Sequence, residues 1–187
     1  MDLQQAIRSR RAVRAFTPEP VDRALLLRLV DAAIQAPSAV NEQPWSFTVI
    51  QDPAVLARIS TESKAHMLAS PPHGLSTEQF AQRLRDPEFD IFYHAPALIV
   101  ISSVAADQWA VENCTLAAEN LMLAACAEGL GSCWIGFAQR WLATAAGKAV
   151  LGVPPAYLPV APIIVGHPRG AAPPVPRKPP EIRWIGG

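Results

Sequence analysis

The chain has 187 residues, of which half are apolar, and its 16 basic residues balance its 16 acidic ones. This length suits one compact domain spanning residues 1–187, and the apolar content is enough to bury a substantial core. The formal net charge of zero excludes a general electrostatic attraction to nucleic acid or to an anionic membrane. Any site for an anionic ligand must therefore be built locally from a few cationic side chains.

The cysteines and histidines predict neither a disulfide framework nor a metal site. Cys114, Cys126 and Cys133 form an odd number with no close pair, which favours reduced core thiols in a cytoplasmic protein. The four histidines, which lack metal-ligand spacing, are His66, His73, His94 and His167. The first residues lack the basic start and apolar core of a signal peptide. No apolar run reaches the ~18 residues of a membrane span, so no membrane partner is expected.

The N-terminal half predicts helices around one strand. Residues 2–9 have the apolar spacing of a short helix. Asp22 is a suitable cap for a second helix, and Pro37 ends it because proline disfavours helical geometry in the preceding residue. The alternation of apolar and polar residues over 45–49 predicts a strand. Further helices are expected over 53–64 and 76–84, in a segment, 52–92, that we expect to line the substrate opening.

The C-terminal half predicts strands that alternate with helices. Strands are expected over 97–101, 132–135 and 160–165, and helices over 109–128 and 139–150. The helix over 109–128 is apolar on more than one face and ends at Gly129, so we expect it to be buried, in part between subunits.

The last segment of the chain has a composition of its own. Ten of the nineteen prolines fall between Pro154 and Pro180, which predicts an extended tail from about residue 168. Because this tail ends in the apolar residues Ile182, Trp184 and Ile185, we expect it to dock on a surface, such as that of a partner chain.

Four arginines fall within seven residues near the N-terminus. By number alone, Arg8, Arg10, Arg11 and Arg14 would favour a solvated basic face. The surrounding segment, however, resembles the opening of the nitroreductase family; it reads Ile7-x-x-Arg10-Arg11-x-Val13-Arg14-x-Phe16. The resemblance implies that Arg10 holds the phosphate of FMN and that Arg14 lies at the flavin ring edge or the ribityl chain. Planar guanidinium groups suit such contacts because they donate paired hydrogen bonds to phosphate.

The same resemblance places Arg11 and Ala12 on the cofactor. Many family members have serine where this chain has Ala12. The loss of one hydroxyl hydrogen bond is worth about 1 kcal/mol, which is too little to exclude binding.

A second segment, between a predicted helix and a predicted strand, also resembles this family. In isolation it would be an ordinary turn with Trp45 in the core, and we expect Trp45 to be a core residue. The segment reads Ala36-Pro37-Ser38-Ala39-Val40-Asn41-Glu42-Gln43-Pro44-Trp45. The resemblance implies that this loop reaches the FMN of the other subunit through Pro37, Ser38, Ala39, Asn41 and Gln43. Asn41 and Gln43 offer both donors and acceptors, as the ribityl and pyrimidine groups require.

Two further segments carry the resemblance. Residues 129–136 are not a dinucleotide fingerprint, because Trp134 occupies the third glycine position and a helix precedes them. They resemble a family strand, which implies that the backbone of Ile135 and Gly136 approaches the hydride-accepting nitrogen of the flavin. In the tail, Arg177 would be a second phosphate ligand by resemblance, against the alternative of a surface arginine.

Taken together, these resemblances imply an α+β fold with a central, mostly antiparallel sheet flanked by helices, in an intertwined homodimer with shared FMN sites. The implied activity is NAD(P)H-dependent reduction of nitroaromatics, quinones or other electron-poor acceptors by ping-pong hydride transfer. The chemistry would take place on FMN, with no catalytic side chain and no metal. Two alternatives are an oxygen-dependent flavin-cleaving enzyme on the same fold and a non-catalytic FMN-binding or redox-sensing module.

Overall fold

The structure is a computed structural model that describes residues 1–71 and 78–186. These residues form one four-stranded sheet in the order β1-β2-β4-β3, in which every neighbouring pair is antiparallel. The strands are β1 (Trp45–Ile50), β2 (Ala97–Ser103), β3 (Gly131–Trp134) and β4 (Leu158–Gly166). The predicted α+β fold with an antiparallel central sheet is confirmed.

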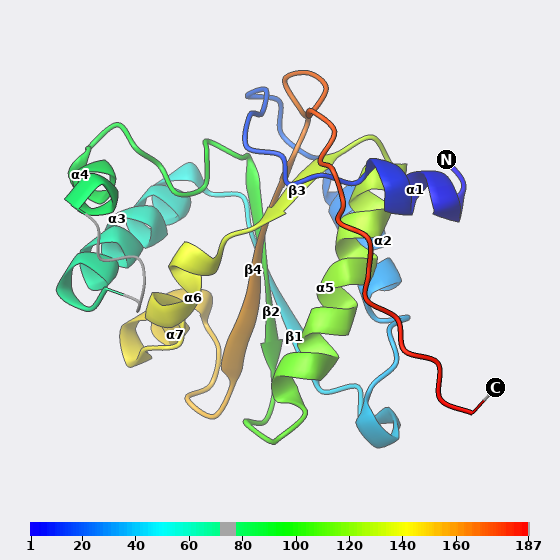
Figure 1. Cartoon of the computed structure of the whole chain (residues 1–187). Coiled ribbons are helices and arrows are strands. Elements are labelled where there is room, and N and C mark those ends of the chain that lie inside the picture. Colours follow the sequence, from blue (N-terminus) through cyan, green and yellow to red (C-terminus); the bar gives the residue numbers. More distant parts are fainter. Residues whose placement is uncertain (72–77, 187) are drawn as a thin grey trace.

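Helices cover both faces of the sheet (Figure 1). On one side lie α1 (Leu3–Ser9), α2 (Arg23–Ala33) and α5 (Ala110–Ala127). On the other side lie α3 (Pro53–Ala69), α4 (Glu78–Arg85), α6 (Gly136–Leu142) and α7 (Ala145–Leu151). A short 3-10 turn, η1 (Ala39–Asn41), connects α2 to β1.

Aspartates fix the starts of three helices, as their positions in the sequence suggest. Asp2 and Gln5 form a reciprocal capping box at α1. Asp22 accepts a hydrogen bond from the backbone N–H of Ala24 at the start of α2, and Asp52 caps α3. Each cap satisfies an amide that a helix leaves without an intrahelical partner.

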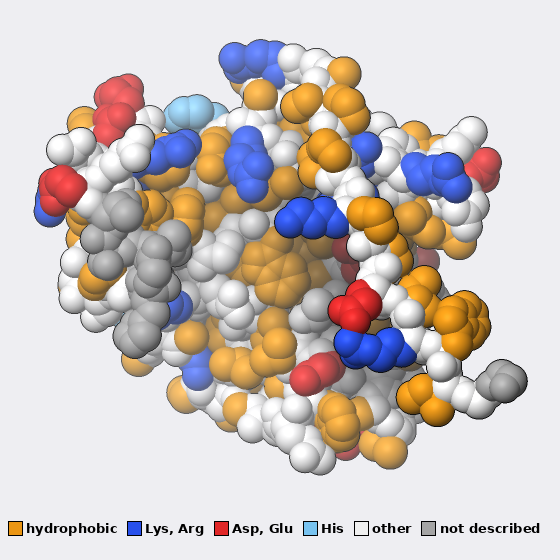
Figure 2. All heavy atoms as spheres, viewed as in Figure 1, with side chains coloured by type: hydrophobic (Ala, Val, Ile, Leu, Met, Phe, Trp, Pro, Cys, Tyr) orange, Lys and Arg blue, Asp and Glu red, His pale blue; other side chains and the backbone are white. Residues whose placement is uncertain are grey.

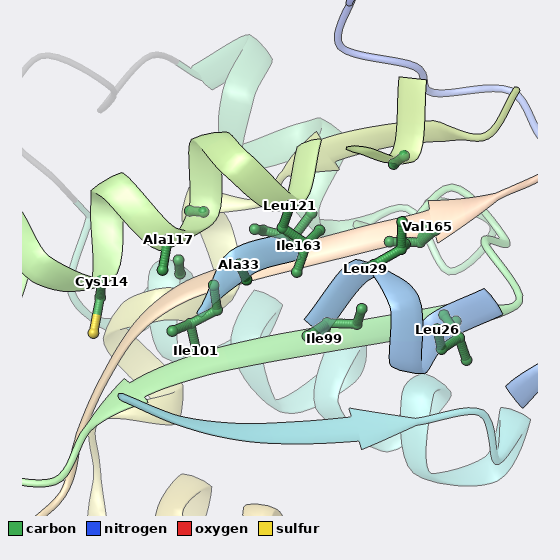
Figure 3. Packing of buried hydrophobic residues seen from close by; sticks show 14 of the residues in the cluster. Leu26, Leu29, Ala33, Ile99, Ile101, Cys114, Ala117, Leu121, Ile163 and Val165 are labelled. Carbon is green, nitrogen blue, oxygen red and sulfur yellow. The ribbon is translucent and has the colours of Figure 1, made fainter. Parts of the chain in front are cut away.

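The larger hydrophobic core lies between the sheet and the α2–α5 pair (Figure 3). Figure 3 shows Leu26, Leu29 and Ala33 of α2 facing Ile99 and Ile101 of β2. The adjacent residues of β2, Leu98 and Val100, point to a second cluster under α3, α6 and α7. Because both faces of β2 are covered, every one of its residues is buried.

The prediction of a single helix over 139–150 is wrong, because two helices occupy this region. α6 ends at Leu142, and the Thr144 hydroxyl caps α7 by accepting a hydrogen bond from Gly147 N–H at 3.1 Å. Gly147 also packs against the end of α6, where a Cβ would lie 2.3 Å from the carbonyl oxygen of Trp141. The Thr144 cap and the closely packed Gly147 thus produce a sharp turn between α6 and α7.

Other boundaries also differ from the expected ones. β3 ends at Trp134, so Ile135 is a helix cap and Gly136 is the first residue of α6. The helix expected over 53–64 continues to Ala69. α4 begins at Glu78, whereas residues 76 and 77 of the helix predicted there lie outside the described residues.

The tail beyond Gly170 is extended and runs in front of α5 in the view of Figure 1. Its start is fixed to the body, since Arg169 N–H donates to Ala15 O at 2.9 Å and Phe16 pairs with Pro168. Further along, the side chains of Trp184 and Ile185 are 89% and 95% exposed. Docking of this tail on a partner chain stays a prediction.

Candidate functional site

The arginine segment lies directly beside β3. Val13 N–H donates to Ser132 O at 3.0 Å, and Ala12 forms an isolated parallel bridge with Ser132. This close approach requires a glycine at position 131, because a Cβ there would lie 2.7 Å from Val13 Cγ1. The structure thus brings together two of the segments that the sequence singled out.

The arginines of this segment have different partners. Arg10 Nε lies 3.5 Å from a Glu119 carboxylate oxygen, and the Arg10 side chain is only 22% exposed. The Arg11 guanidinium turns back to donate to the backbone carbonyls of Arg8 and Arg10. The Arg14 guanidinium lies over the ring of Tyr93, 5.9 Å from its centroid.

Cys133 of β3 experiences the field of these cations. Burial raises the pKa of the Cys133 thiol, and the charges of Arg14 and Arg10 oppose that rise. The charges of both guanidinium groups therefore act on the same strand.

A hollow of about 390 Å³ opens beside this segment. Its walls include Arg10, Arg11, Val13 and Ser132, together with Pro168 from the start of the tail. Figure 2 shows Lys and Arg side chains above the central part of this face, next to hydrophobic side chains. Cationic groups beside an apolar surface can hold a ligand that is anionic at one end and flat and apolar at the other.

The backbone N–H groups of Ile135 and Gly136, which follow β3, differ in whether they are free to bind a ligand. Ile135 N–H donates to Pro162 O at 2.8 Å and is therefore engaged in the fold. Gly136 N–H has no acceptor within the described part of the chain, and no heavy atom lies within 4 Å of where its Cβ would be. Gly136 thus offers a hydrogen-bond donor with open space around it.

The loop that carries Ser38, Asn41 and Gln43 is held by local hydrogen bonds. Gln43 N–H donates to Ser38 Oγ at 2.9 Å, and Gln43 Nε2 donates to Asn41 Oδ1 at 3.0 Å. Ala39 N–H donates to Asn113 Oδ1 on α5. Asn41 and Gln43 are exposed, as is Pro37, so the loop presents amide groups to its surroundings.

This loop lies at the opposite end of the sheet from the arginine segment. Trp45 is level with Ser103, the last residue of β2. Ser132, beside the arginines, pairs with Val165 of β4. Val165 in turn pairs with Ala97, the first residue of β2. A strand of this length spans roughly 20 Å. One chain therefore does not bring Asn41 and Gln43 onto Arg10 and Arg14.

The remaining residues that the sequence singled out differ in exposure and surroundings. Arg177 lies on the exposed tail, where no side-chain partner is found among residues 1–71 and 78–186. Trp45 is half-buried against the larger core, as expected. Cys114 is a free, buried thiol whose pKa burial raises to about 12.

No cluster of possible metal ligands occurs in the described residues, and His73, one of the four histidines, lies outside them. No described helix is long and apolar enough to cross a membrane.

A second cavity, of about 560 Å³, lies between α3 and the loop over 87–96. None of the predicted site residues lines it.

Two residues near the arginines had not been predicted from the sequence, namely Glu119 and Tyr93. The apolar–polar pattern of the chain carries no signal for either, because both contacts join distant parts of the chain.

Comparison with known proteins supplies the context for this geometry. A model described as the nitroreductase family matches residues 7–167. An "NADH dehydrogenase" of Thermus thermophilus is 37% identical over 73 residues, which are 38% of this chain and 36% of that protein. The 4-nitrobenzoate reductase of Pseudomonas putida is 49% identical over 49 residues, 26% of this chain and 22% of that one. These matches thus span about a third or less of the length of the curated relatives.

The fold is also that of a solved nitroreductase. The crystal structure of a nitroreductase with bound FMN from Bacteroides fragilis superposes with a TM-score of 0.86, at 24% identity, over 100% of both chains.

Proposed function

Because the chain belongs to the nitroreductase family, we propose that it is an FMN-dependent oxidoreductase. In this proposal it takes electrons from NADH or NADPH and reduces nitroaromatics, quinones or other electron-poor acceptors. The observation that carries it is the placement of Arg10 and Arg14 around β3, the strand that ends two residues before the open amide of Gly136. Arg10 also lines the hollow beside this strand. FMN in the Bacteroides fragilis neighbour and the printed names of the relatives support it.

The phosphate end of FMN fits the arginine side of the hollow. Arg10 is partly buried and Arg11 lines the same wall, so both can donate to phosphate oxygens without a large loss of side-chain freedom. Arg10 would exchange Glu119 for the phosphate. Ala12 contributes only backbone here, because it lacks the hydroxyl that many relatives have.

The ring end fits the other side of the site. Arg14 supplies a positive charge near the pyrimidine edge, where it favours the reduced, anionic flavin. Gly136 supplies a backbone donor, and its missing side chain leaves room for close approach of a flat ring. When bound, FMN would accept a hydride from nicotinamide and then deliver it to the acceptor. These two half-reactions make the mechanism ping-pong.

In this proposal, the side-chain amides of Asn41 and Gln43 reach the cofactor from a second subunit. The loop with Ser38, Asn41 and Gln43 is exposed and already ordered by its own hydrogen bonds. We propose a homodimer in which this loop, including Pro37 and Ala39, completes the site of the partner. Arg177 on the extended tail would add a second phosphate contact. Exposed apolar side chains on α5 and the tail, such as Leu116 and Trp184, would become buried.

The test is a visible absorption spectrum of the purified protein, repeated without oxygen after NADH or NADPH is added. A yellow flavin spectrum that bleaches and then recovers with a nitroaromatic or a quinone is expected. A colourless protein that takes up no added FMN would overturn the proposal. Bound FMN that NAD(P)H does not reduce would indicate the binding module, and loss of flavin absorbance in air would indicate the flavin-cleaving enzyme.

A further inference from the structure

Backbone strain is confined to two loops of the described chain. Non-glycine residues with a positive φ are Val40, Asn41, Gln43, Tyr93 and His94. The first three belong to the loop that we propose to complete a cofactor site. Left-handed backbone is unfavourable for side chains larger than asparagine or aspartate and gathers at functional sites. The turn at Tyr93 and His94, with φ of 54° and 55°, therefore needs an explanation of its own.

Side chains from two elements build this turn. The Asp90 carboxylate accepts hydrogen bonds from the backbone N–H groups of Phe92 at 3.0 Å and His94 at 2.8 Å. From α3, the Lys64 ammonium donates to the carbonyls of Asp86 and Phe89, at 2.9 and 2.7 Å. The strained conformation is thus held in place by several contacts, which fixes the direction of the Tyr93 side chain.

The Tyr93 ring contacts Arg14, which we propose to lie at the cofactor. The Arg14 guanidinium lies 5.9 Å from its centroid, within the range of a cation–π contact. Phe89 meets the same ring edge to face, with centroids 6.1 Å apart and planes at 78°. Arg83 of α4 covers Phe89 at 4.4 Å. A column of four side chains therefore runs from α4 to Arg14.

α4 also contacts the opposite side of the candidate site. Its Phe80 lies 5.6 Å from the ring of Phe137, which directly follows Gly136. The segment that contains α4 and the strained turn therefore contacts both the neighbour of Gly136 and, through Tyr93, Arg14.

We propose that Tyr93 is a positioning residue that holds the Arg14 guanidinium at the flavin ring edge. This inference rests on the proposed function, since the ring edge is that of FMN. A cation held in one place stabilises the charge of the reduced flavin more than a cation that samples many rotamers. Tyr93 therefore acts on the reduction potential through Arg14, while the strained turn keeps its ring in the required direction.

The experiment compares Tyr93→Asn with Tyr93→Phe. Asparagine tolerates positive φ, so it removes the ring and keeps the turn. Phenylalanine keeps the ring and serves as the matched control. The readouts are the dissociation constant of oxidised FMN and the two-electron midpoint potential of bound FMN. We expect Tyr93→Phe to match the wild type and Tyr93→Asn to bind oxidised FMN about threefold more weakly.

The potential should fall in the same variant. A further threefold loss of preference for reduced over oxidised FMN corresponds to a midpoint potential about 14 mV lower. Tyr93→Gly, which also lacks the ring and adopts positive φ freely, should give the same result if Tyr93→Asn is unstable. A wild-type potential in a folded variant without the ring would overturn the inference.

A double-mutant cycle shows whether Tyr93 acts through Arg14. In an Arg14→Met background, Tyr93→Asn should change neither the potential nor the affinity further. An effect of full size in that background would also overturn the inference. Wild-type protein that binds no FMN would instead overturn the proposed function, so the two failures can be told apart.

Discussion

The arginine segment and the Ser38–Gln43 loop prepare for a ligand in different ways. The arginine segment is joined to the protein's own sheet, through Val13 and Ser132, and Arg10 is largely covered. The loop is exposed and is ordered mainly by hydrogen bonds between its own residues. In the proposed site, the core of one chain thus fixes one half, while local turn chemistry presents the other half outward.

The largest expected effect comes from the arginine segment. Arg10→Ala should weaken FMN binding at least tenfold, because a charge-assisted contact to phosphate is worth about 1.5–3 kcal/mol. Arg177→Ala on the tail should act in the same direction. Titration of each apoprotein with FMN, followed by flavin fluorescence, measures the loss. Riboflavin lacks the phosphate and is the control ligand, so equal losses for both flavins would contradict the assignment.

The second prediction concerns the contact that joins the arginine segment to the sheet. Gly131→Ala would place a methyl group 2.7 Å from Val13 Cγ1, so the free energy of unfolding should fall by about 1–3 kcal/mol. Gly136→Ala is the matched control, since no heavy atom lies within 4 Å of its Cβ position. Urea unfolding of both variants makes the comparison. A Gly131→Ala protein as stable as Gly136→Ala would show that the segment can shift freely.

The third prediction concerns the preformed loop. Ser38→Ala removes the acceptor of Gln43 N–H, which should reduce FMN affinity two- to fivefold, or about 0.5–1 kcal/mol. The free energy of unfolding of the core should stay at its wild-type value, because the loop lies outside both hydrophobic clusters. Isothermal titration with FMN and urea unfolding measure the two quantities. Ser38→Thr keeps the acceptor and should bind FMN like the wild type.

The fourth prediction tests whether the two halves belong to different chains. Arg10→Ala and Gln43→Ala chains, co-expressed with different tags, form a heterodimer in which one site carries both changes and the other carries neither. About half of the wild-type FMN content is therefore expected in the doubly purified species. If both halves served the same chain, no intact site would exist and the heterodimer would bind as weakly as the parent variants.

Much of the fold could be predicted because its signals are local. Asp22 marks a helix start through a hydrogen bond to the first turn, and the alternation that begins at Trp45 marks a strand. The sharp turn at Thr144 was missed because a threonine cap within an apolar pattern resembles a continuous helix. Its cause is the packing of Gly147 on α6, which only the folded chain shows.

For the proposed site, the sequence singles out only residues that form short motifs. The resemblance points to the arginines and to the Ser38–Gln43 loop, but the distance between them depends on the register of three pairs of strands. Tyr93 gave no signal, since nothing in the sequence distinguishes a tyrosine in a left-handed turn from one in a core. The open amide of Gly136 and the engaged amide of Ile135 differ only through the pairing with Pro162.

Burial of Cys133 has a consequence for the chemistry that the protein can tolerate. Quinones are electrophiles that add to thiolates, and the thiolate is the nucleophilic form of cysteine. Burial raises the pKa of the Cys133 thiol despite the neighbouring arginines, so the position of this side chain disfavours the nucleophilic thiolate. A strand beside the proposed site for electron-poor acceptors can thus carry a sulfur atom that is protected from alkylation by them.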